Sequence, residues 1–358
     1  MYSQHDAAGP PARRILLHLG MNKTGSTALQ VALRGYRTAE WAMLDIPGFT
    51  QTQAMCLAFR NTVPPQLYVS RDEAGRAAER AKARAALEQA LAEERRSVII
   101  SSEFLSDFTG DGEVEGALAA LRRHAEDITA IVYLRDPAGY AASLYQQSLK
   151  TRLPGADLRG LYPRYRRRLR PWVKTLGRRG VIFRPYSPGA YPGDALMRDF
   201  AAHGGIDPTA MKPVPRRANA SLSAEATALL YCYRQKHPQM PGDPAWRRAE
   251  AKMVLRLKGF GERSFSFSPA AKAHIIDGHE ADLAWAEARL GTGFAPQAAT
   301  GTALRLDSPE QFDDVAQESF ADFREWLAAC GPYPARRLRT PAQALRALVE
   351  RAYEQGGD

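Results

Sequence analysis

The sequence predicts an α/β fold: a three-layer α/β/α arrangement with a central, mostly parallel sheet and a mainly helical C-terminal region. Short apolar runs alternate with segments of helical composition between residues 14 and 183, a pattern typical of parallel sheets with helices on both faces. A glycine-rich segment separates the first apolar run from the first helical segment. Beyond Pro213 the strand pattern fades and helical segments dominate.

Four short apolar runs are expected to form buried strands, because turn residues bound them. They are Arg14–Leu19, Val98–Ile100, Ile128–Leu134 and Val181–Phe183. Helices are expected between and after them, at residues 26–34, 72–95, 113–125 and 137–150. The last of these opens with Asp136-Pro137, an N-cap followed by proline at the first helical position.

Two further regions complete the chain. Residues 41–70 are expected to be irregular, since prolines and Gly48 interrupt them. The C-terminal region has helical composition at residues 222–237, 246–258, 269–290 and 309–329.

The composition is that of an ordinary globular protein. Of 358 residues, 45% are apolar and 25% charged, which excludes wholesale disorder. No window reaches the ~18 apolar residues of a membrane span, and the first residues, MYSQHDAAGPPARR, lack the apolar core of a secretory signal. The isolated Cys56, Cys232 and Cys330 fit neither a metal site nor a disulfide framework. We therefore expect a cytoplasmic protein.

The charge balance favours an anionic ligand. There are 49 basic and 39 acidic residues, a net charge of +10, and only nine of the basic residues are lysines. Arginine binds phosphate, sulfate and carboxylate through the paired N–H donors of its planar guanidinium group. A bias toward alanine, arginine and glycine codons would produce the same count, so both interpretations are open.

The strongest motif is Gly20–Thr27, GMNKTGST, between the first predicted strand and the first predicted helix. Glycines let the backbone curl, and N–H groups and the dipole at a helix start favour an anion. Lys23 adds a mobile charge, and Ser26 and Thr27 can cap the helix and donate hydroxyls to the same anion. A plain capping turn is the alternative interpretation.

This segment differs from the nucleoside-triphosphatase loop G-x-x-x-x-G-K-[ST]. Here Lys23 precedes the second glycine and Ser26 follows that glycine directly. The arrangement that presents a hydroxyl to Mg²⁺ is therefore missing. A diphosphate-like ligand without metal fits better than ATP.

A second anion site is expected after the third strand. Arg135 lies where ligands bind in open α/β sheets, at the carboxyl end of a strand. Ser143 follows eight residues later on the next helix. An Arg-Asp contact at a strand end is commonly structural, so the pair alone is a weak signal.

Taken together, the segments His18–Gln30, Ile131–Pro137 and Ala142–Gln147 resemble the sulfotransferase family that uses 3′-phosphoadenylyl sulfate (PAPS), especially its bacterial and carbohydrate-directed branches. The resemblance covers roughly residues 14–235 and implies a P-loop-type fold. It implies that the first segment holds the 5′-phosphosulfate and that Arg135 and Ser143 hold the 3′-phosphate. The residues expected at the 5′ end are Asn22, Lys23, Thr24, Gly25, Ser26 and Thr27.

The resemblance implies transfer of a sulfuryl group to a hydroxyl or amine of an acceptor, with a carbohydrate or glycoconjugate expected. Lys23 would stabilise the leaving phosphate. Glu103, after the second strand, is the expected general base; a helix-starting acid capped by Ser101 or Ser102 is the alternative. His18, within the first strand, is a supporting catalytic candidate.

Other basic residues are secondary candidates. The family contributes a basic loop over the 3′-phosphate, for which Arg216-Arg217 is the nearest match. The run Arg159–Arg170 either guides an acidic partner or is a solvated helix face. Histidines share no ligand-like spacing with cysteines or carboxylates, so no metal is expected, and nucleic acid is not expected as a partner.

These interpretations divide the chain into a flexible tail at 1–13, a sulfotransferase-like nucleotide-binding domain at 14–235, and a helical extension at 236–358 packed on the same domain. Two other functions stay open. A P-loop kinase would use Mg-ATP, but its phosphate-binding loop would require a lysine directly before Ser or Thr. A non-catalytic module would bind an anionic polymer through its arginines.

Overall fold

The computed structural model describes residues 12–187, 191, 193–214, 222–239, 242–294, 303–331 and 337–355. The chain forms two compact units, each assembled from separate stretches of sequence. The sheet unit comprises Met1–Arg135, Arg164–Arg216 and Asp282–Ala295. The helical unit comprises Asp136–Pro163, Arg217–Ala281 and Pro296–Asp358. The domain boundary expected at residue 235 stays a prediction.

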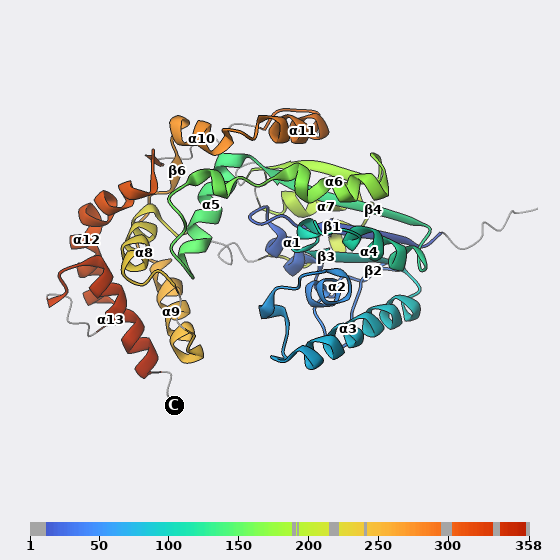
Figure 1. The fold of residues 1–358 in the computed structure, drawn as a ribbon, viewed down its shortest axis with the longest axis horizontal. Helices are drawn as coiled ribbons and strands as arrows, with labels where there is room; N and C mark the ends of the chain where they lie inside the picture. Colours follow the sequence, from blue (N-terminus) through green and yellow to red (C-terminus); the bar gives the residue numbers. More distant parts are fainter. Residues whose placement is uncertain are drawn as a thin grey trace, which may run out of the picture. The chain divides into compact units, whose positions relative to one another are not determined.

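The sheet unit is built on five strands in the order β2-β3-β1-β4-β5, and every neighbouring pair is parallel. The strands are β1 (Arg14–Leu19), β2 (Trp41–Met43), β3 (Ser97–Ser102), β4 (Asp127–Arg135) and β5 (Val181–Tyr186). Because β1 lies in the middle, the segment that follows it emerges between the ends of β3 and β4 (Figure 1). The predicted α/β fold with a parallel sheet is confirmed.

Helices flank this sheet on both sides. On one face, α1 (Ser26–Leu33) and α7 (Ala195–Gly204) pack with every second strand residue, including Leu16 and Ile131, into one apolar cluster. The alternate residues belong to the opposite face, because side chains along a strand point to opposite sides. The other helices of the unit are α2 (Gln51–Phe59), α3 (Glu73–Glu93), α4 (Glu113–Arg122), α6 (Tyr165–Leu176) and most of α11 (Glu280–Leu290).

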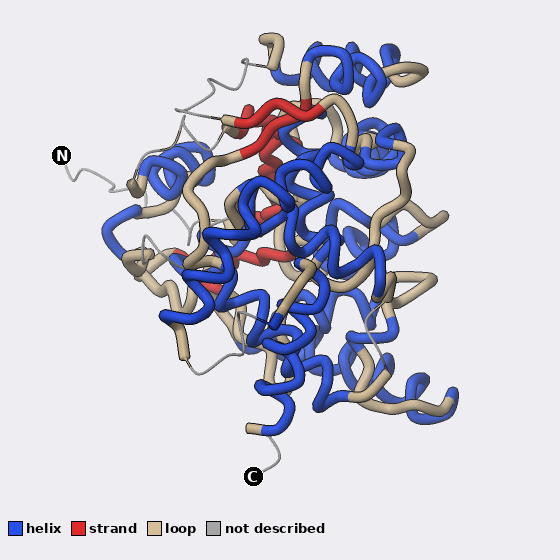
Figure 2. The backbone as a smooth tube through the Cα atoms, turned by 90° about the vertical axis from the view of Figure 1, so that its left-hand side faces the viewer, coloured by secondary structure: helices blue, strands red, loops and turns tan. Residues whose placement is uncertain are grey.

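The helical unit confirms the predicted helical character of the C-terminal region. Its α-helices are α5 (Pro137–Leu149), α8 (Ala224–Lys236), α9 (Pro244–Leu257), α10 (Pro269–Ile276), α12 (Phe312–Ala329) and α13 (Pro341–Glu354). Helix α8 packs against α12 and α13, and α13 also packs against α9. Two short parallel strands, β6 (Phe265–Phe267) and β7 (Leu304–Leu306), accompany them. Helices also make up most of the described chain as a whole (Figure 2).

Short 3₁₀ helices complete the described elements: η1 (Pro65–Leu67), η2 (Leu105–Asp107), η3 (Leu158–Leu161), η4 (Pro208–Ala210) and η5 (Pro309–Gln311). Within the described ranges, no helix is both long enough and apolar enough to cross a membrane.

Several element predictions were wrong in detail. Residues 41–70 are not irregular: they contain β2 and α2, and α2 begins at a capping box in which Thr50 and Gln53 satisfy each other's backbone N–H groups. The single helix expected at 269–290 is two helices, because Gly278 adopts a left-handed φ of 72° between them. The strands β6 and β7 lie beyond Pro213, where no strand was expected.

Candidate functional site

Hydrogen bonds hold the segment after β1 against the end of β3 and the turn that follows it. The Gly20 amide donates to the Ser102 carbonyl at 3.0 Å, and the Ser106 hydroxyl donates to the Gly20 carbonyl at 2.8 Å. The approach is so close that a Cβ at Gly20 would lie 2.8 Å from the Cα of Glu103. A glycine at this position therefore lets the loop and Glu103 lie side by side.

The loop is also closed from within. The hydroxyls of Thr24 and Ser26 both donate to the Met21 carbonyl, at 2.8 and 3.2 Å, and both residues are buried. Lys23 and Gly25 have left-handed φ angles of 69° and 80°, a backbone pattern that turns successive N–H groups toward one point.

The prediction that Ser26 or Thr27 caps α1 was wrong. The N-cap is Gly25, which makes no side-chain cap. The reason is that the Ser26 hydroxyl is already used inside the loop, while Thr27 is exposed on the first turn.

The start of α1 presents unsatisfied donors. The backbone N–H groups of Gly25, Ser26 and Thr27 have no acceptor among the described residues. Such donors at a helix N-terminus, together with the positive end of the helix dipole, attract an anion. Asn22 and Lys23 lie half-buried beside them in the same loop.

Arg135 is brought onto this loop. It ends β4, and its Nη1 donates to the Lys23 carbonyl at 3.4 Å. The Tyr165 hydroxyl of α6 donates to the Arg135 carbonyl. The structure thus places two predicted anion-binding residues, Lys23 and Arg135, in direct contact at the edge where the strands end.

Tyr186 is a neighbour of the site that the sequence analysis missed. It ends β5 opposite Arg135, and a Cβ at Gly25 would lie 3.2 Å from its ring. Burial raises the pKa of Tyr186, and the positive charge of Arg135 opposes that rise. Its position as the last residue of the strand beside β4 is the signal that could have identified it.

Glu103 lies in a turn directly after β3 and is half-buried. Its carboxylate has no hydrogen-bond or ion-pair partner among the described residues. The alternative interpretation, a helix-starting acid, was wrong: the following helix η2 begins at Leu105 and has no side-chain cap. The Ser102 hydroxyl instead accepts from the Phe104 amide at 3.2 Å, within the turn.

His18 lies beneath the site, in the core. It is fully buried, its Nδ1 lies 2.8 Å from the Ser101 hydroxyl, and its ring meets the edge of Phe200 at a centroid distance of 5.6 Å. Burial lowers the pKa of His18 to about 4, so the imidazole is neutral near pH 7. Its Nε2 has no partner within the described part of the chain. A role for His18 in catalysis stays a prediction.

The other predicted residues are not gathered with the loop. Ser143 is half-buried on α5, which belongs to the helical unit, so its pairing with Arg135 stays a prediction. Arg216 and Arg217 lie outside the described residues.

The basic run is divided between the two units. Arg159 forms an exposed ion pair with Asp157 in the helical unit. Exposed arginines on and just before α6 belong to the sheet unit: Arg164, Arg166, Arg167 and Arg170. As for metals, the described residues contain no group of three or more histidine, cysteine or carboxylate side chains that could hold an ion.

No protein-family model matches the chain, and no curated protein matches it. Among solved structures, a sulfotransferase from Alicyclobacillus acidocaldarius is similar, with a TM-score of 0.42 and 16% sequence identity. The similarity covers 79% of this chain and 98% of that protein.

Proposed function

We propose that the sheet unit carries the active site of a sulfotransferase, which moves the sulfuryl group of PAPS to a hydroxyl or amine of a carbohydrate acceptor. The observation that carries this proposal is the contact between Arg135 and the Lys23 carbonyl. It brings Arg135 onto the loop that contains Lys23 and three N–H groups without an acceptor among the described residues. Glu103 lies against Gly20, at the start of the same loop.

The donor nucleotide has two anionic ends, and the residues suit both. The N–H groups of Gly25, Ser26 and Thr27 and the Lys23 ammonium would hold the 5′-phosphosulfate. Arg135 would hold the 3′-phosphate by charge-assisted hydrogen bonds, and Ser143 and the Arg216-Arg217 pair are proposed to complete that end. Thr24, through its bond to Met21, keeps the loop closed.

The transfer step needs positioning and charge stabilisation more than covalent chemistry. The acceptor oxygen bonds to sulfur as the bond from sulfur to the 5′-phosphate oxygen breaks. The acceptor proton passes to the Glu103 carboxylate, which has no described partner competing for it. Lys23 stabilises the negative charge that develops on the leaving phosphate.

Donor binding is tested first, by calorimetric titration with adenosine 3′,5′-bisphosphate in the absence of Mg²⁺. We expect binding that is lost or at least tenfold weaker in Lys23→Ala and in Arg135→Ala, since each removes a charged contact. Lys82→Ala is the matched control, because Lys82 is an exposed lysine on α3. Tight binding of Mg-ATP with no binding of the bisphosphate would overturn the proposal in favour of a kinase.

Turnover is tested with PAPS labelled in its sulfuryl group and a panel of mono- and disaccharides. Label transfer that falls on Lys23→Ala, by about 10²–10³-fold for loss of one stabilising donor, is expected. A protein that instead binds sulfated polymers in a salt-sensitive way, equally in wild type and Lys23→Ala, and that never transfers label, would be an anionic-polymer module.

A further inference from the structure

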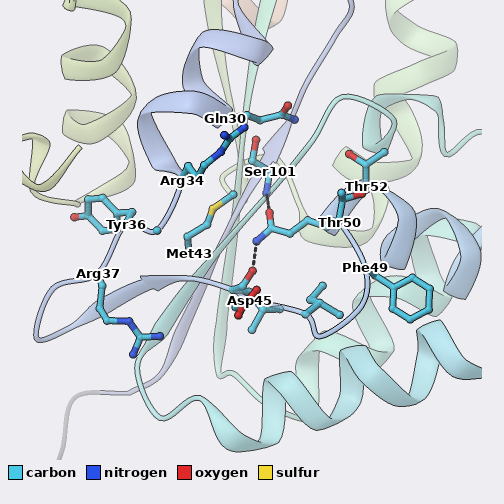
Figure 3. Close-up of a pocket in the computed structure, with 14 residues that line it drawn as sticks. Gln30, Arg34, Tyr36, Arg37, Met43, Asp45, Phe49, Thr50, Thr52 and Ser101 are labelled. Carbon is cyan, nitrogen blue, oxygen red and sulfur yellow. Dashed lines mark hydrogen bonds between the residues drawn. The ribbon is translucent and has the colours of Figure 1, made fainter. Parts of the chain in front are cut away.

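A pocket of about 510 Å³ opens in the sheet unit where β2 and β3 end. Its walls are α1 on one side and the segment from the end of β2 to the start of α2 on the other (Figure 3). Polar side chains line it together with the apolar Phe49 and Met43. A volume of this size suits a small organic molecule.

One wall of the pocket is hydrogen-bonded to a residue of the proposed active site. Thr52, which lines the pocket, donates its hydroxyl to the Ser102 hydroxyl at 3.0 Å. Ser102 in turn accepts the Gly20 amide and directly precedes Glu103. Ser102 therefore links one wall of the pocket to the loop and to the proposed base.

One wall is rigid. The side-chain NH₂ group of Gln51 donates to the backbone carbonyls of Leu44 and Ile99, at 2.7 and 3.1 Å. Its side-chain oxygen accepts from the backbone N–H of Ser101 at 2.7 Å. These bonds hold the start of α2 against β3 (Figure 3). Gln51 is thus committed to the protein itself, and it shapes the pocket without being available to a ligand.

Some other polar side chains in the pocket have no hydrogen-bond or ion-pair partner among the described residues. Gln30, Arg34 and Asp45 make no side-chain hydrogen bond or ion pair with described residues. Together they offer amide, guanidinium and carboxylate groups, which can pair with hydroxyls as donors and as acceptors. This mixture fits a polyhydroxylated ligand.

The pocket also carries positive charge. Arg37 forms an ion pair with Glu94 at 3.4 Å, whereas Arg34 has no ion-pair partner in the described part of the chain. A second cation lies close by: a Cβ at Gly35 would be only 3.6 Å from the Lys212 ammonium. A carboxylate carried by the ligand would therefore be stabilised by the guanidinium group of Arg34.

We infer that this pocket binds the acceptor, and that the acceptor is a sugar bearing a carboxylate. Arg34 binds the carboxylate, and Asp45 and Gln30 bind ring hydroxyls. The reacting hydroxyl would point past Thr52, whose partner Ser102 directly precedes Glu103. The assignment of this molecule as acceptor rests on the function proposed above.

The test uses two disaccharides that differ in one group, cellobiose and cellobiouronic acid, in which a carboxylate replaces a hydroxymethyl group. Each is titrated calorimetrically into the protein saturated with adenosine 3′,5′-bisphosphate. We expect the acidic sugar to bind at least tenfold more tightly than the neutral one. Arg34→Gln should abolish that preference, and Asp45→Asn should weaken both sugars about equally.

Arg71→Gln is the matched control, because Arg71 is an exposed arginine outside the pocket, and it should leave the preference unchanged. Equal affinity for the two sugars, no binding of either, or a preference that persists in Arg34→Gln would overturn the inference. Failure of the bisphosphate to bind is a separate result, which would overturn the proposed function alone. The sugar titrations without nucleotide would then still decide the pocket's ligand.

Discussion

Two sets of charged side chains, one in each unit, have opposite surroundings. In the helical unit, Arg234 and Glu250 are both 0% exposed and pair at 2.7 Å. Arg234 also donates to the carbonyls of Leu149 and Lys150, and Glu250 accepts from the Tyr233 hydroxyl at 2.8 Å. In the sheet unit, Glu103, Arg34 and Asp45 make no such contacts with described residues.

The difference distinguishes charge that stabilises the fold from charge that is available to a ligand. A buried ion is tolerated only where partners replace its lost hydration, so a saturated pair such as Arg234–Glu250 has no capacity left for a ligand. Uncommitted charges at the ends of parallel strands contribute little to stability but can bind and react. Substitutions should therefore affect stability in one region and activity in the other.

The largest effect is expected for Glu103→Gln. Loss of a general base lowers kcat by about 10²–10⁴-fold, while the free energy of unfolding stays within about 0.5 kcal/mol because no contact is lost. Steady-state kinetics and urea unfolding measure the two quantities. Glu126→Gln, an exposed glutamate before β4 at the opposite edge of the sheet, serves as the control. A variant that keeps its kcat would show that Glu103 is not the base.

Arg234→Met should produce the reverse pattern. It leaves the Glu250 carboxylate buried without its ion partner, which costs about 3–5 kcal/mol of unfolding free energy. The double variant Arg234→Met/Glu250→Leu should recover most of that loss, because no charge is then left buried. Chemical denaturation measures both. A loss below ~1 kcal/mol in the single variant would mean that the pair is not buried as described.

His18 should make stability depend on pH. Burial lowers its pKa to about 4 from an ordinary 6.5, so the unfolded chain takes up the proton first as the pH falls. The contribution of the neutral His18 side chain to the free energy of unfolding is therefore complete above pH ~6.5. It is lost as the pH falls toward ~4, and the loss amounts to up to ~3 kcal/mol.

The measurement is the free energy of unfolding in urea across this pH range. His18→Leu should flatten the dependence, whereas His274→Gln, which changes a half-exposed histidine, should not. An unchanged slope in His18→Leu would assign the effect to other groups.

The smallest effects compare two glycines. Gly20→Ala places a methyl group 2.8 Å from the Glu103 backbone, so loop and turn must separate; a cost of about 1–3 kcal/mol and reduced bisphosphate affinity are expected. Gly116→Ala, on the exposed face of α4 with no atom within 4 Å of the new methyl, should stabilise by about 0.5–1 kcal/mol. Thermal unfolding of both variants would test whether the close approach of Gly20 to the Glu103 backbone is needed for stability.

Elements with strong local signals were predictable. The strand Arg14–Leu19 has the bounds that its apolar run predicted, and Asp136-Pro137 opens α5 with the Asp136 side chain accepting from the Gly139 amide. The helix α2 was missed because its start depends on Thr50 and Gln53 within a proline-interrupted segment. Strands β2, β6 and β7 were missed since each has three residues and forms only by pairing with a neighbour.

The same division applies to the candidate site. The loop at residues 20–27 was recognisable because glycine, lysine and hydroxyl residues between a strand and a helix determine the local backbone. The commitment of the Ser26 hydroxyl to Met21, and the proximity of Tyr186 to Gly25, were not recognisable. Both depend on how the loop closes and on which strand lies beside β4.

By itself, the sequence determined the alternation of strands and helices, the glycine-rich loop after β1 and the acid that follows β3, because these depend on side-chain chemistry and short-range backbone preferences. Only the tertiary structure decided the strand order, the contact of Arg135 with Lys23 and the pocket beside α1. Those features join residues that are far apart along the chain, and their separation in space is set by packing of the whole sheet rather than by any local pattern.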